Sequence, residues 1–65
     1  MKFEKGQKVE VILTSAQMQK FGISEIKNPC TIMGFFENGI NGYYLRDAAG
    51  RDKAVPASAN AITTI

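Results

Sequence analysis

The sequence predicts a mainly β domain of about five antiparallel strands, with one short helix after the first strand and a 3-10 turn before the last. Two apolar, β-prone runs at 30–37 and 42–46 are separated by Asn-Gly pairs, and the segment 47–50 is a second turn signal before a third short run. Asn and Gly tolerate the positive φ of tight hairpin loops, and aromatic or β-branched residues suit a half-buried pleated surface. These runs predict a three-stranded antiparallel meander around which the rest of the chain closes.

Length and composition indicate one small domain spanning residues 1–65. A domain of this size buries only about 60% of the surface that its unfolded chain exposes, so its stability is marginal. Hydrophobic residues make up 45% of the chain, which argues against disorder. No apolar run approaches the ~20 residues that cross a bilayer, and residues 1–8 lack the apolar core of a signal peptide. We therefore expect a cytoplasmic protein without membrane contact.

The first predicted strand begins near Lys8, where polar and apolar residues alternate and place Val9, Val11 and Leu13 inward. Ile12 breaks this alternation, and we expect the following segment to cover it. Thr14 or Ser15 can cap a helix of about two turns over 16–21, and Gly22 suits the left-handed residue past its end. Such a short helix must dock on the sheet, with Met18 and Phe21 on one face.

The second predicted strand, 30–37, carries apolar residues on both faces. Pro29 cannot donate to a ladder and suits the start of a strand. Alternation places Cys30, Ile32, Gly34 and Phe36 on one face, and Thr31, Met33 and Phe35 on the other. A glycine in mid-strand often marks a bulge or a sharp bend, which a small barrel needs in order to close.

The remaining strands follow two turn signals. In the third strand, 42–46, Tyr43 and Leu45 point one way and Tyr44 and Arg46 the other. Residues 47–50 are typical of a type I turn with a glycine bulge. The fourth strand covers 52–55, residues 56–60 permit one 3-10 turn, and the last strand covers 61–65 with Ile62 inward.

Three stretches resemble the SH3-like small β-barrels. Gly-Gln-Lys-Val-Glu-Val at 6–11 is similar to the first strand of these barrels, and residues 43–55 are similar to the two strands that flank their distal hairpin. Residues 55–62 are similar to the valine–proline pair, 3-10 turn and final strand that end many such barrels. The resemblance implies a single SH3-like barrel that works by binding, in a group whose ligands include peptides, RNA, DNA, modified histone tails and ribosomes. The chain has no tryptophan and no Ala-Leu-Tyr motif, so we do not expect it to bind proline-rich peptides.

Residue types exclude most catalytic and metal sites. The chain has no histidine and one cysteine, so a Ser–His pair, an internal disulfide and a zinc site of the usual ligands are excluded. Asp47 and Asp52 flank one hairpin, a pattern more typical of a solvated turn than of an acid pair. Cys30, in an apolar strand, is expected to be a buried small hydrophobe and not a reactive thiol. We expect no enzyme activity, metal or cofactor.

Aromatic and basic residues of the predicted meander form the candidate binding site: Met33, Phe35, Tyr44, Arg46, Arg51 and Lys53. Tyrosine and arginine are enriched at protein interfaces, so the first hypothesis is a protein-interaction module, such as a small phage or mobile-element product that engages a host protein. Aromatics flanked by cations also bind single-stranded nucleic acid, although a net charge of +2 is small for that role. A third hypothesis is an accessory subunit or homo-oligomer that pairs through Met33 and Phe35. A supporting role in the core is the alternative for Phe35 and Tyr44.

Overall fold

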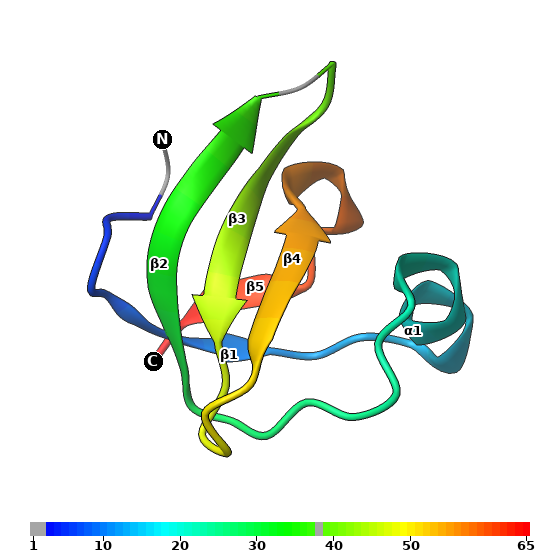
Figure 1. Ribbon diagram of the computed structural model, residues 1–65, viewed down its shortest axis with the longest axis horizontal. Coiled ribbons are helices and arrows are strands. Elements are labelled where there is room, and N and C mark those ends of the chain that lie inside the picture. The colour runs from blue at the N-terminus through cyan, green and yellow to red at the C-terminus, as the bar shows by residue number, and fades with distance from the viewer. Residues whose placement is uncertain (1–2, 38) are drawn as a thin grey trace.

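The computed structural model describes residues 3–37 and 39–65. Along the chain lie β1 (Lys8–Val11), α1 (Ser15–Phe21), β2 (Cys30–Glu37), β3 (Asn41–Arg46), β4 (Asp52–Pro56), the 3-10 turn η1 (Ala57–Ala59) and β5 (Ile62–Thr64) (Figure 1). These elements confirm the mainly β class, the five strands, the short helix after the first strand and the 3-10 turn before the last. Asn38, which belongs to one predicted Asn-Gly turn, lies outside the described residues.

The strands form one antiparallel sheet in the order β4-β3-β2-β1-β5. In Figure 1, β2, β3 and β4 lie in front, and β1 and β5 cross behind them. Within the described residues, 3–37 and 39–65, β4 and β5 do not pair. The sheet is therefore open, and the predicted closure into a barrel is not observed. Pro56, the last residue of β4, has no backbone N–H that could donate a hydrogen bond to a further strand. The 3-10 turn η1 then leads the chain to β5, on the far side of β1. The resemblance to SH3-like barrels stays a prediction.

The core lies between these two layers. Val9, Ile32, Leu45 and Val55 have no exposed surface, and Met18 and Phe21 of α1 pack against the same cluster. Val9 and Val11 are inward as predicted, and Leu13 is partly buried against the core. The expected cover over Ile12 is absent, because α1 packs on the core instead, and this side chain is 66% exposed.

A β-bulge between Ile32 and Gly34 changes the predicted faces of β2. Before it, Ile32 pairs with Leu45; after it, Gly34 pairs with Tyr44 and Phe35 with Tyr43. Since directly paired residues share a face, the extra residue, Met33, moves Phe35 to the core side of the sheet. The predicted bulge or bend at Gly34 is confirmed, whereas the simple alternation through Phe36 is wrong.

Short-range hydrogen bonds explain the helix and the second hairpin. Thr14 Oγ1 accepts from Gln17 N at 3.1 Å, and Gln17 Oε1 accepts from Thr14 N at 3.0 Å, which is a capping box. Gln17 Nε2 also donates to Ala59 O at 3.2 Å and so ties α1 to η1. In the hairpin, Gly50 has φ of +84° and its N–H donates to Asp47 O at 3.0 Å, as a type I turn with a glycine bulge requires.

Candidate binding face

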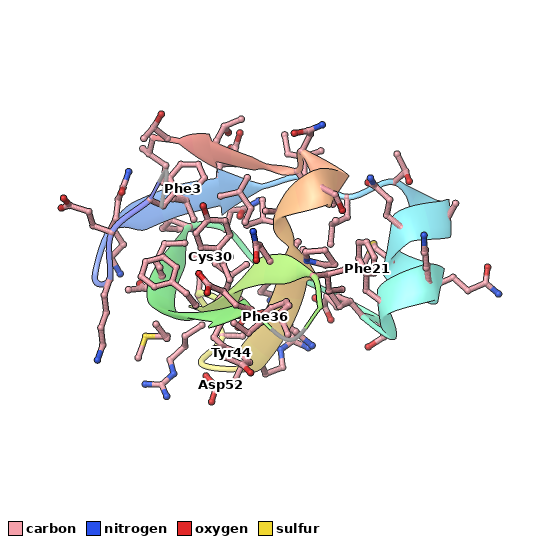
Figure 2. All side chains as sticks on the ribbon, turned by 90° about the horizontal axis from the view of Figure 1, so that it is seen from above. Phe3, Phe21, Cys30, Phe36, Tyr44 and Asp52 are labelled. Atoms are coloured by element: carbon pink, nitrogen blue, oxygen red, sulfur yellow. The ribbon has the colours of Figure 1, made fainter. Side chains whose placement is uncertain are left out.

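The side of β2, β3 and β4 that faces away from the core is called the outer face here, and it comprises Met33, Phe36, Tyr44, Arg46, Asp52 and Ala54. The register sets Tyr44 between Gly34 and Ala54, and Arg46 between Thr31 and Asp52. Tyr43 and Leu45, which alternate with these residues, are buried. In Figure 2, Phe36, Tyr44 and Asp52 lie together on the side of the molecule away from Phe3. This face is the broad front of the molecule in Figure 1.

An aromatic pair occupies the middle of the outer face. The ring centroids of Phe36 and Tyr44 are 5.2 Å apart at an interplanar angle of 54°, a favourable tilted arrangement. The Phe36 ring lies over Gly42, its cross-strand partner, because a Cβ added at Gly42 would overlap three atoms of that ring. Tyr44 remains 50% exposed. The pair is therefore held in place by the sheet while the tyrosine stays available for contact.

A shallow hollow of about 340 Å³ borders Tyr44 and reaches β4 at the edge of the sheet. Its lining comes from all three front strands: Met33, Tyr44, Leu45, Arg46, Asp52, Lys53 and Ala54. Ala54 is small and exposed, and it leaves space between Tyr44 and the free edge of β4. A second hollow of about 450 Å³ lies between α1 and η1, with Phe21, Ile40 and Pro56 in its lining.

Charged groups surround the hollow. Arg46 Nε and Asp52 Oδ1 form an exposed ion pair at 2.8 Å, and the hydrogen bond from Arg46 lowers the pKa of the Asp52 carboxyl. Lys8 Nζ donates to Thr31 Oγ1 at 2.7 Å beside them. Within the described residues, Lys53 is in no ion pair. The hollow thus has one partly buried cation, Lys53, that forms no ion pair with another described residue.

The structure brings four of the six predicted binding residues together at this hollow, namely Met33, Tyr44, Arg46 and Lys53. Phe35 lies elsewhere: its ring contacts Tyr43 on the core side, with centroids 5.4 Å apart, although it is 37% exposed. Phe36 takes the place beside Tyr44 that alternation assigned to Phe35. The one signal for this exchange in the sequence is Gly34, the residue typical of a bulge.

Arg51 also lies away from the hollow, in a cluster that joins the β3–β4 turn to the loop before β2. Its guanidinium is 3.2 Å from Asp47 Oδ2 and 3.6 Å from Glu25 Oε2. The buried Asp47 carboxylate accepts from the backbone N–H groups of Arg51, Ala49 and Lys27 at 2.9, 3.1 and 3.2 Å. The first of these bonds contributes most to lowering the pKa of Asp47. This cluster holds the two segments together. The guanidinium of Arg51, which was predicted to bind a ligand, is instead engaged in ion pairs within the cluster.

Cys30 is fully buried, as predicted. Burial, with a smaller effect of the Asp47 charge, raises the pKa of its thiol. The Sγ atom lies 3.5 Å from Asn28 Oδ1 and 3.7 Å from Lys27 O. No group of three or more potential metal ligands is present in residues 3–37 and 39–65. Over the same residues, no helix combines the length and the apolar character that a membrane span requires.

Comparison of the chain with protein-family models, with characterised proteins and with solved structures gave no significant match.

Proposed function

We propose that this protein is a non-enzymatic protein-binding module that uses its outer face. The observation that carries the proposal is Tyr44, which stands half exposed beside a hollow while Phe36 supports it from one side. An aromatic side chain that is already ordered loses little conformational entropy when a partner covers it, and such anchors dominate protein interfaces. The cytoplasmic location and the phage or mobile-element setting expected from the sequence belong to this proposal.

The geometry favours a protein over nucleic acid as the ligand. Bases stack on open aromatic faces, but Gly42 lies against one face of the Phe36 ring, and the tilted Tyr44 ring packs against the same side chain. Of the two cations that line the hollow, Arg46 is already paired with Asp52, and Lys53 lies opposite the buried Leu45 and so belongs to the other side of the sheet. A phosphate backbone requires several free cations in a row, and this face does not supply them.

Affinity capture with the tagged protein tests the proposal. Lysate is applied with and without nuclease to wild type, to Tyr44→Ala and to Ile65→Ala, which truncates a 75%-exposed side chain next to the opposite edge of the sheet. We expect wild type and Ile65→Ala to retain one partner protein with and without nuclease, and Tyr44→Ala to retain none of it. Retention of that partner by Tyr44→Ala, or its loss on nuclease treatment, would contradict binding of a protein through the outer face.

A further inference from the structure

The free edge of β4 carries backbone groups without partners. Asp47 N donates to Arg51 O at 2.9 Å, which makes these two residues a hydrogen-bonded pair. Hydrogen-bonded and non-hydrogen-bonded pairs alternate along an antiparallel ladder, so the Arg46–Asp52, Tyr44–Ala54 and Gly42–Pro56 pairs exchange no bonds. The N–H and C=O groups of Asp52 and Ala54 therefore point away from β3, and among the described residues no other backbone hydrogen bond reaches them.

Pro56 agrees with this assignment. Proline has no N–H, and within a sheet it is tolerated where that N–H would point outward from an edge. Pro56 lies two residues after Ala54, in the same outward-pointing phase. The free edge thus begins at Asp52, ends at Pro56 and borders the hollow that contains Tyr44.

We infer that an extended peptide segment of a partner protein adds to β4 as a sixth strand and places one apolar side chain in the hollow against Tyr44 and Ala54. The inference rests on the proposed function and names its ligand. Strand addition derives affinity from backbone hydrogen bonds and specificity from the pockets that receive alternate side chains. The hollow is that pocket, since Ala54 lies on β4 itself and Met33 and Tyr44 form its apolar wall.

Charge indicates what else the segment carries. Lys53 lies between the two residues with free backbone groups, lines the hollow and has no ion-pair partner within the described residues. A lysine on an edge strand discourages pairing with an uncharged strand. A carboxylate on the incoming segment would neutralise it, so the structure assigns an acidic residue next to the apolar one.

The same lysine argues against a second copy of this chain as the occupant. An antiparallel β4–β4 pair that uses the free groups of both Asp52 and Ala54 would have its two-fold axis at Lys53. Each lysine would then face the lysine of the other copy, and like charges directly opposite each other are destabilising. A shift of the axis to Ala54 would instead pair Asp52 with Pro56, which has no N–H to donate.

A peptide selection tests the inference. A phage-displayed library of random dodecapeptides is selected on the immobilised protein, and enriched sequences are synthesised as capped fluorescein peptides for fluorescence anisotropy. We expect sequences with alternating apolar residues and a neighbouring Asp or Glu. Ala54→Pro removes one outward N–H and should weaken binding on the order of tenfold, since the peptide carbonyl loses its donor. Lys53→Glu should weaken it further at low salt.

The ligand side provides a measurement that does not depend on the fold of a variant. Each amide of a selected peptide is N-methylated in turn. In an added strand, only alternate amides face β4, so methylation should abolish binding at alternate positions and leave it unchanged between them. Binding that tolerates N-methylation everywhere but is lost with Tyr44→Ala would overturn strand addition and leave the outer-face module intact.

Other outcomes overturn both proposals. These are an absence of enriched peptides, or enriched peptides that bind Tyr44→Ala and Ala54→Pro as tightly as wild type. A fluorescein-labelled oligo-dT that binds the protein with a steep loss of affinity on added salt would assign the outer face to nucleic acid. A mass of two chains without peptide, reverted by Ala54→Pro, would assign the edge of β4 to a second copy.

Discussion

The position of the Phe36 ring over Gly42 can be tested with a double-mutant cycle. In the wild type, Gly42→Ala introduces a Cβ that overlaps the ring, and forcing extra atoms into a packed site costs about 1–3 kcal/mol. Alanine in a strand interior is favoured over glycine by roughly 0.5–1 kcal/mol. The net expectation is a loss of about 0.5–2 kcal/mol of unfolding free energy. In a Phe36→Ala background the overlap is absent, so the same change should stabilise the protein by roughly 0.5–1 kcal/mol.

Urea unfolding followed by circular dichroism measures all four proteins of the cycle. Stability for a domain of this length is only about 3–10 kcal/mol, so the expected coupling of about 1–3 kcal/mol is a large shift in midpoint. Gly34→Ala is the matched control, because a Cβ at Gly34 would meet only Tyr44 Cδ2, at 3.8 Å. This is an ordinary contact distance with no overlap to relieve, so the effect of Gly34→Ala should differ between the two backgrounds by less than about 0.5 kcal/mol. If Gly42→Ala has equal effects in both backgrounds, within about 0.5 kcal/mol, the ring does not lie over Gly42 and the outer face is arranged differently.

Three further results are expected. The folded-state pKa of Asp47 is lowered, so the stability that its carboxylate provides is present above the unfolded value of 3.8 and disappears as pH falls below that value. Asp47→Asn should therefore lower the melting temperature at neutral pH and make it depend less on pH in the acid range. Plots of melting temperature against pH that run parallel for the two proteins from pH 2.5 to 7 would contradict this. Thr14→Ala should lower the free energy of unfolding by about 0.5–2 kcal/mol through loss of the helix cap. Urea unfolding compares it with Thr63→Ala, a change at an exposed threonine that should cost much less. Equal losses for the two variants would argue against the cap. Cys30 is buried and the pKa of its thiol is raised, so iodoacetamide should alkylate it slowly in buffer and rapidly in urea; a rapid reaction of the folded protein would show that the site is open.

Local patterns account for the elements and most of the core. The alternation around Val9 and Val11 specified β1 because side chains in a strand point to opposite faces. Gly22 and Gly50 marked the helix end and the hairpin turn, and both have positive φ, at +71° and +84°. The outward direction of Tyr44 followed from its alternation with the buried Tyr43. Each of these features depends on a few consecutive residues, so the sequence was sufficient.

Contacts between distant residues decided the rest. Asn28 illustrates this, because its side-chain amide accepts a hydrogen bond from Val11 N at 2.8 Å and donates one to Val11 O at 2.9 Å. At the end of β1, this side chain makes the two hydrogen bonds that the backbone of a neighbouring strand would otherwise make. Nothing near either residue in the sequence indicates this pairing across 17 positions.

The composition of the binding face shows the same division. By itself the sequence determined the strands, the turns and the outward direction of Tyr44 and Arg46. Only the tertiary structure decided that Phe36 and not Phe35 lies beside Tyr44, and that Arg51 is held by Asp47 and Glu25. The physical reason is that backbone preferences act over a few residues, whereas the effect of one bulge residue, or the choice of partner for a buried carboxylate, depends on segments that meet only in the folded chain.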